Sequence, residues 1–145
     1  MSGILCAVRG GPASQPTIHK SIQLAQETGL TIYFLYVVNL DFMSATASSR
    51  YHTIDQEMIR LGEFILLIAE ENAQSQGVQA EGRVQHGNVQ EEIIKLCAEL
   101  QADYVVLGSP RQTTNADVLG DERMQQFCER IATEGGASVV LAGED

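Results

Sequence analysis

The sequence predicts an α/β fold: an open, five-stranded parallel sheet with helices on both faces, as in flavodoxin- and Rossmann-like proteins. Strand-like and helix-like segments alternate five times along the 145 residues. Two of the strand-like segments, Ile4–Val8 and Tyr104–Leu107, are short apolar runs that enter glycine-bearing turns, as parallel strands buried on both faces do. Alternation at this spacing indicates right-handed crossovers between parallel strands. The pattern alone leaves the strand order open.

The first half of the chain shows clear helix and strand signals. After the strand Ile4–Val8, a helix is predicted over Ser14–Thr28, because Ser14 can cap it, Pro16 suits its first turn and Gly29 suits its end. The segment Thr31–Val38 is rich in β-branched and aromatic residues and is predicted to be the second strand.

The middle of the chain contains a long predicted helix. Residues 39–52 show little pattern and indicate a loop or a frayed helix start. A helix is then expected over Thr53–Ser75, ended by Gly77. Steps of four and three residues place one set of side chains on its expected inner face: Ile54, Met58, Leu61, Ile65, Ile68 and Asn72. The short, partly polar segment Ala80–Gln85 suits a strand at a sheet edge.

The last part of the chain completes the alternation. Asn88 followed by Glu91 resembles a capping box, so a helix opens there, with Val89, Ile93, Leu96 and Leu100 facing inward. The strand Tyr104–Leu107 and a loop over Ser109–Leu119 follow. A final helix is expected from Gly120-Asp121 to just before Gly135, and then the fifth strand, Ser138–Ala142.

Composition and charge narrow the classes of function. Hydrophobic residues make up 44% of the chain, and we expect one domain over residues 1–145. The net charge of −10 repels nucleic acid and anionic membranes. No apolar run approaches membrane-spanning length, and the start does not read as a signal peptide. The three cysteines, Cys6, Cys97 and Cys128, are scattered in apolar patterns, which favours a reducing, cytoplasmic compartment.

The glycine turns after the first and fourth strands form the candidate ligand site. Ligands of open α/β sheets bind beyond the carboxyl ends of the strands, where the strand order reverses. If the two strands are neighbours there, their turns line one crevice. The candidate residues are Arg9, Gly10, Gly11, Val38, Gly108, Ser109, Arg111, Gly120 and Asp121.

Two interpretations of the arginines stay open. Arg9 and Arg111 could together bind a phosphate or carboxylate, or they could pair with Asp117, Asp121 or Glu122 and fill the crevice. We favour the second.

Five segments, in this order and spacing, resemble the universal stress protein family over almost the whole chain. They are residues 4–14 (ILCAVRGGPAS), 33–38 (YFLYVV), 86–94 (HGNVQEEII), 102–109 (ADYVVLGS) and 137–142 (ASVVLA). The resemblance implies an adenine nucleotide alpha hydrolase-like sheet of order 3-2-1-4-5. It also implies a homodimer that pairs through the fifth strand, residues 138–142. Some members of the family bind ATP and others do not.

The loop that identifies the ATP-binding members is altered here. In that loop, Gly-x-x-Gly is followed by nine residues and then Gly with Ser or Thr. Gly108 matches the first glycine, but Arg111 stands at the second, and Gly120 comes after eight residues and precedes Asp121. Arg9 stands where the family often has an acidic residue. An arginine at a close-approach glycine obstructs the backbone donors, and Asp121 places negative charge at a helix N-terminus.

We therefore expect a non-enzymatic, stress-associated binding or regulatory module with a degenerate nucleotide site, no cofactor, no metal and an unidentified regulatory protein partner. The alternative is an ATP or AMP binder that uses Arg9 and Arg111. A remote alternative is a PP-loop-like ATP pyrophosphatase, whose loop Gly10, Gly11 and Ser14 match in part. No catalytic set is found, since His19, His52 and His86 have no acid at catalytic or metal spacing in the sequence.

Overall fold

The computed structural model describes residues 3–8, 15–38, 48–108 and 125–142, with backbone alone for residues 48–52 and 142. The elements in chain order are β1 (Ile4–Ala7), α1 (Gln15–Thr28), β2 (Ile32–Val38), α2 (Ser48–Ser75), β3 (Ala80–His86), α3 (Val89–Leu100), β4 (Tyr104–Gly108), the π-helix η2 (Ile131–Gly135) and β5 (Ser138–Ala142). Residues 125–130 are α-helical and continue into η2, so we call residues 125–135 the C-terminal helix.

The five strands form one parallel sheet in the order β3-β2-β1-β4-β5. Both the fold class and the strand order that the resemblance implied are thereby confirmed. The central strand β1 pairs with β2 and with β4, so that Leu5 lies beside Tyr33 on one side and Val105 on the other. The strand order reverses at β1, between β2 and β4, and a ligand site is expected at that point in such sheets.

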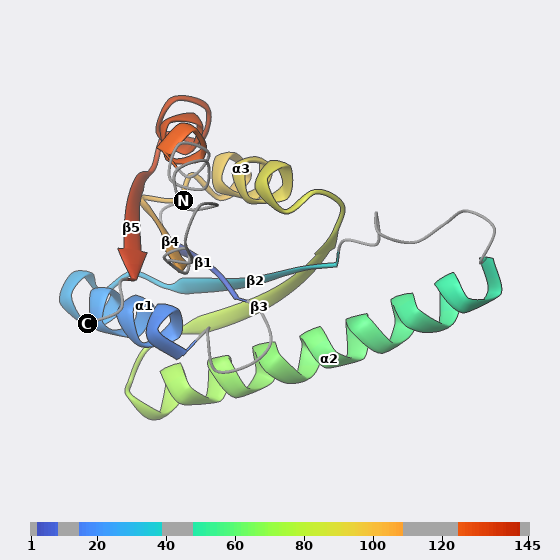
Figure 1. Ribbon diagram of the computed structural model, residues 1–145. Coiled ribbons are helices and arrows are strands. Elements are labelled where there is room, and N and C mark those ends of the chain that lie inside the picture. Colours follow the sequence, from blue (N-terminus) through green and yellow to red (C-terminus); the bar gives the residue numbers. More distant parts are fainter. Residues whose placement is uncertain (1–2, 9–14, 39–47, 109–124, 143–145) are drawn as a thin grey trace, which may run out of the picture.

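Helices cover both faces of the sheet, as Figure 1 shows. Helices α1 and α2 lie on one face, while α3 and the C-terminal helix lie on the other. Strand β1 serves both cores because successive side chains point to opposite faces. Ile4 and Cys6 enter the core under α1 and α2, and Leu5 enters the core under α3. This two-sided burial explains why the central strands are continuous apolar runs.

Helix α2 begins at Ser48, earlier than predicted, and its inner face differs from the predicted one. The buried positions are Gly62, Leu66, Ala69 and Ala73, with Ile54, Met58 and Ile65 packed partly against the core. The predicted inward positions Leu61 and Ile68 are about half exposed, at 50% and 46%, and Asn72 is exposed. The prediction was wrong for these three residues, because this helix packs on the sheet mainly through small residues rather than large ones.

Glycine allows α2 to approach the sheet closely. A Cβ atom at Gly62 would overlap the ring of Tyr36 on β2. A Cβ atom at Gly82 of β3 would lie 2.9 Å from the Cβ of Leu66. Helix and sheet therefore fit together only because these two positions lack a side chain.

All three cysteines are free thiols. Cys6 and Cys97 are buried, as the sequence predicted, and Cys128 is partly buried. Burial raises the pKa of the Cys6 thiol to about 12 and raises the pKa values of Cys97 and Cys128. Since the thiolate is the reactive form, these cysteines are poor nucleophiles.

Candidate functional site

A crevice of about 580 Å³ lies at the carboxyl ends of β1, β2 and β4. Its floor is formed by strand residues: Ala7, Val8, Leu35, Tyr36, Val37, Leu107 and Gly108. Val89, Gln90 and Ile93 of α3 and Phe127 of the C-terminal helix form its walls. The crevice therefore lies where the strand order reverses, as expected for this sheet.

The described lining of the crevice is mainly apolar. None of the described lining residues carries a formal charge, and Gln90 supplies the one amide side chain among them. The aromatic ring on the α3 side is that of Phe127 from the C-terminal helix, whereas the ring of Tyr36 packs against Gly62 of α2 on the other face of the sheet. Apolar clefts of this volume are typical of small-molecule sites. The chemistry of this part suits a largely uncharged group better than an anion.

The N-terminus of α3 adjoins the crevice but already has its own partners. The Oδ1 atom of Asn88 accepts a hydrogen bond from the backbone N–H of Glu91 at 3.1 Å, which confirms the predicted cap. Glu91 and Glu92 place two carboxylates in the first turn of the helix. Negative side chains at this end interact favourably with the helix dipole. A phosphate added there would meet these carboxylates rather than a bare positive helix end.

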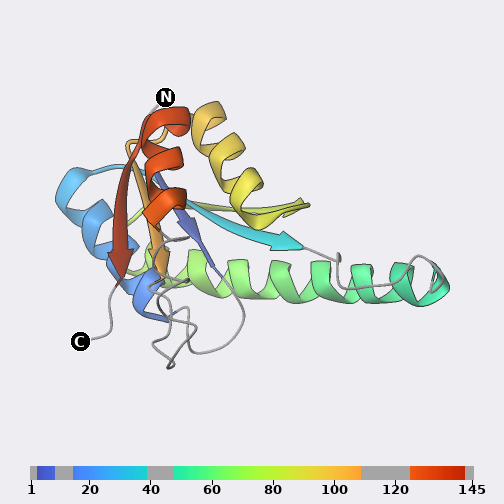
Figure 2. The same cartoon turned by 45° about the horizontal axis from the view of Figure 1, so that its top comes forward.

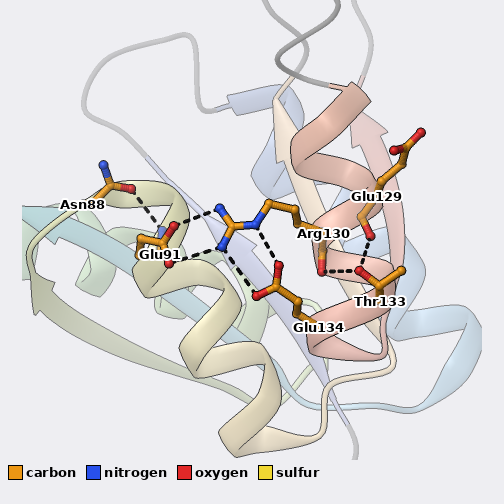
Figure 3. A network of polar contacts seen from close by, with 6 residues as sticks. All are labelled: Asn88, Glu91, Glu129, Arg130, Thr133 and Glu134. Atoms are coloured by element: carbon orange, nitrogen blue, oxygen red, sulfur yellow. Dashed lines mark hydrogen bonds and ion pairs between the residues drawn. The ribbon is translucent and has the colours of Figure 1, made fainter.

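Arg130 ties the two helical walls of the crevice together (Figure 3). Its Nη1 atom lies 2.8 Å from Oε2 of Glu91 on α3, and its Nε atom lies 2.8 Å from Oε2 of Glu134 on its own helix. The side chain of Glu91 thus faces Arg130. Hydrogen bonding to Arg130, and then its charge, lowers the pKa of Glu91. The two carboxylates raise the pKa of Arg130.

Removing the Arg130 charge is expected to make stability less dependent on pH. Because the folded-state pKa of Glu91 is lowered, the bridge stabilises the fold above the ordinary glutamate pKa. That contribution is lost as pH falls through the lowered pKa. Arg130→Met should therefore melt below the wild type at pH 7, and the difference should vanish in acid. Thermal unfolding followed across this pH range measures it.

Arg83→Met provides the matched control. The Arg83 side chain is as exposed as that of Arg130, at 37% in both, but its carboxylate partner Glu81 lies 3.8 Å away. We expect no pH-dependent melting difference for Arg83→Met. A difference that persists in acid for Arg130→Met would show that packing, and not the ion pair, links the two walls.

The structure places two of the predicted site residues. Gly108 lines the crevice, whereas Val38 is 1% exposed and packs in the core under α1 and α2, away from the crevice lining. The remaining candidates lie outside the described residues: Arg9, Gly10, Gly11, Ser109, Arg111, Gly120 and Asp121. The predicted loop Ser109–Leu119 also lies outside them.

Sequence reasoning missed two features near the strand ends. Val89 was expected to face inward, yet it is 41% exposed and forms part of the crevice wall with Phe127. The Nε2 atom of His86, at the end of β3, lies 3.0 Å from Oδ1 of Asp55 on α2. That pair is 31 positions apart in the chain, so spacing along the sequence gave no signal. It lies away from the crevice lining and links α2 to the edge strand.

The fold agrees with a comparison against known families. The sequence profile of the universal stress protein family matches residues 1–141. This chain belongs to the universal stress protein family. No curated protein matched it in a sequence comparison.

Solved structures of the family share the fold of this chain. UspA from Lactobacillus plantarum superimposes with a TM-score of 0.76 at 13% identity, covering 97% of this chain and 96% of that one. The Archaeoglobus fulgidus universal stress protein in complex with dAMP gives 0.64 at 14% identity, covering 97% of each chain. An Arabidopsis thaliana family member with AMP bound gives 0.62 at 15% identity, covering 100% of this chain and 93% of that one.

The described residues contain neither a metal centre nor a membrane-spanning helix. No group of three or more His, Cys, Asp or Glu side chains in this part of the chain is arranged to hold a metal ion. Of the helices that the structure describes, none has the length and apolar character needed to cross a membrane.

Proposed function

We propose that this universal stress protein is a non-enzymatic, stress-associated binding or regulatory module whose nucleotide site no longer accepts ATP. The observation that carries the proposal is the crevice lining, which is mainly apolar and uncharged over the described residues. At the adjoining α3 N-terminus, Glu91 and Glu92 supply negative charge. The sequence adds Arg111 and Asp121 at two positions where the ATP-binding loop has glycine and a hydroxyl residue. Together these features disfavour the binding of a triphosphate in the crevice.

A second candidate function is the binding of a nucleoside monophosphate. The crevice volume of about 580 Å³ suits a small ligand, and its aromatic and aliphatic lining suits a base. Family structures are described as complexes with dAMP and with AMP. In this candidate, Arg9 and Arg111 supply the phosphate contacts in place of the altered loop.

Nucleotide-dependent melting separates the two candidates. We expect millimolar ATP to leave the melting temperature almost unchanged. A ligand present at about 100 times its dissociation constant stabilises a protein by about 2.7 kcal/mol, which moves the melting temperature by several degrees in a domain of this size. Differential scanning fluorimetry with ATP, AMP and inorganic phosphate provides the measurement.

Val89→Glu is the control variant for this experiment. Val89 lines the crevice and is exposed, so a carboxylate there should repel a nucleotide without disturbing the core. A shift with AMP that Val89→Glu abolishes would establish the second candidate. A shift of the same size with ATP would contradict the proposed loss of ATP binding.

We propose that the chain acts as a cytoplasmic homodimer paired through β5. Strand β5 lies at the edge of the sheet, and no described strand pairs with its outer side. Leu141 on this strand is 44% exposed. An apolar edge strand invites pairing with another chain, and a two-fold antiparallel arrangement satisfies both edges.

Leu141→Lys is expected to weaken this dimer and raise its dissociation constant by about tenfold or more, because a charge would enter the apolar interface. Val140 is less suitable, since it packs partly against the core under α1 and α2. Light scattering at high micromolar concentration measures the mass of both proteins. A wild-type protein with the mass of a monomer at this concentration would contradict the dimer proposal.

A further inference from the structure

The outer face of α2 carries an apolar stripe that no described part of the chain covers. The stripe consists of Leu61, Phe64, Leu67 and Ile68, which are 50%, 60%, 52% and 46% exposed. The opposite side of the helix, with Leu66, packs on the sheet, so α2 is apolar on two faces. Large apolar side chains gathered on one exposed face mark an interaction surface more often than single exposed residues do.

The far face of α2 is accessible along its length. Figures 1 and 2 show α2 running along the outside of the sheet and continuing past the tip of β2. The stripe covers residues 61–68, or about 10 Å of helix at about 1.5 Å per residue. An elongated partner such as a helix can therefore lie along the stripe without meeting the sheet.

Carboxylates outnumber cations on the part of α2 that carries the stripe. Residues 53–75 contain one basic side chain, Arg60, and five acidic ones: Asp55, Glu57, Glu63, Glu70 and Glu71. Asp55 is paired with β3, and Glu70 is partly buried. Glu57, Glu63 and Glu71 are exposed, and none of the three forms an ion pair with a described residue. Three carboxylates are therefore available to a partner.

These three carboxylates lie around the apolar side chains. Glu57 and Glu71 are seven residues before and after Phe64, which is about two turns of helix, so they close the two ends of the stripe. Glu63 is about one turn before Leu67 and borders the stripe on that side. The stripe is thus an apolar surface within a rim of negative charge.

This combination of charge and apolar surface selects a cationic partner. A second copy of α2 would bring the same excess of carboxylates to the contact, and an anionic membrane would be repelled in the same way. Helices that lie on membranes carry Lys and Arg around their apolar face, whereas the exposed described side chains of α2 include one cation, Arg60.

We propose that the stripe is the docking surface for a basic amphipathic helix of another protein. The apolar residues of that helix would pack on Phe64 and its neighbours. Lysines or arginines about seven residues to either side of this contact would reach Glu57 and Glu71, because the spacing along two adjacent helices is the same. Charge complementarity of this kind fixes the partner and its register.

This surface is distinct from the crevice lining and from the edge of β5, so the proposal depends neither on the ligand nor on the dimer. Four apolar side chains form a patch smaller than a stable interface of about 800 Å² per partner, so the association is weak. The rim charges are exposed, and salt should therefore weaken it further.

A pair of designed peptides tests the chemistry of the partner on the full chain. The first is a fluorescently labelled helix of about 18 residues, with leucines at steps of three and four residues and lysines on both flanks. The second has glutamate in place of every lysine. Fluorescence anisotropy at about 0.15 M salt should give a dissociation constant on the order of tens of micromolar for the lysine peptide. The glutamate peptide should bind at least about tenfold more weakly, and equal affinities would overturn the proposal.

Matched charge variants show where the lysine peptide binds. Glu57→Gln with Glu71→Gln should raise the dissociation constant about fivefold, because two exposed ion pairs with the peptide are lost. Glu99→Gln with Glu129→Gln removes the same charge from exposed positions of α3 and the C-terminal helix and should leave the affinity unchanged. Arg60→Gln should tighten binding about twofold, because a repelling charge is removed. Equal effects of the two double variants would show attraction by net charge alone and contradict docking on α2.

Phe64→Gln tests the apolar part of the stripe without changing the charge. It should raise the dissociation constant of the lysine peptide about tenfold or more, because a central aromatic contact is lost. Far-UV circular dichroism checks the fold, and the charge variants keep the test decisive if Phe64→Gln fails to fold. Loss of peptide binding in Val89→Glu but not in Phe64→Gln would place the peptide in the crevice and overturn the proposal. Binding of the chain to phosphatidylcholine vesicles that Phe64→Gln abolishes would assign the stripe to a lipid surface and overturn it as well.

Discussion

Replacing Phe34 by alanine is expected to lower the free energy of unfolding by about 3–5 kcal/mol. Phe34 is a large, fully buried side chain on β2, in the core under α1 and α2. The loss combines the transfer of the ring with the cavity that close-packed neighbours cannot fill. The melting temperature should fall by roughly 10 °C, at about 2–4 °C per kcal/mol for a domain of this size. Urea unfolding and calorimetry measure the two quantities.

Phe64→Ala makes the same chemical change on the exposed face of α2. Phe64 is 60% exposed, so at low protein concentration its removal should change the free energy of unfolding by no more than about 0.5 kcal/mol. Equal losses for the two variants would contradict the assignment of the buried face of α2 and of β2.

Gly62→Ala is expected to destabilise the protein by about 1–3 kcal/mol even though alanine favours helices. The added methyl group would overlap the ring of Tyr36, which is 8% exposed and held on β2. Relief requires α2 to move away from the sheet, with loss of the contacts that Leu66 and Ala69 make in the core. Chemical denaturation gives the free energy of unfolding.

A double-mutant cycle with Tyr36→Ala isolates this steric effect. Without the ring, Gly62→Ala should become neutral or stabilising by up to about 1 kcal/mol, because only the helix propensity then changes. The same destabilisation in both backgrounds would show that Gly62 is required for a reason other than its approach to Tyr36.

The strand pattern predicted the sheet well, while the phase of α2 was predicted wrongly. Strands buried on both faces leave short, continuous apolar runs such as Ile4–Val8, which are easily recognised beside turn residues, and the family resemblance supplied their order. Helix α2 packs through Gly62, Ala69 and Ala73, whose small side chains contribute little to a hydropathy pattern. The larger residues Leu61 and Ile68 dominate that pattern but lie on the opposite face.

The location of the crevice could be predicted, but its walls could not. Parallel strands bring their carboxyl ends together, so Gly108 was expected beside a crevice at this edge of the sheet, and it lines one. Ligand binding by Gly108 stays a prediction. Phe127 reaches the crevice only because the C-terminal helix packs beside α3. The Arg130–Glu91 pair also depends on that packing, since the two residues are 39 positions apart. Tertiary contacts of this kind leave no periodic trace in a single sequence.

The proposed loss of ATP binding can be tested by mass spectrometry of small molecules released from protein purified gently from cells. We expect no stoichiometric ATP, because the described crevice lining is uncharged and the first turn of α3 carries the carboxylates of Glu91 and Glu92. In addition, Arg111 stands where the ATP-binding loop has a glycine. The same extraction applied to the Val89→Glu variant corrects for nucleotide bound elsewhere on the surface. ATP recovered at about one molecule per chain from the wild type, and lost from Val89→Glu, would contradict the proposed function.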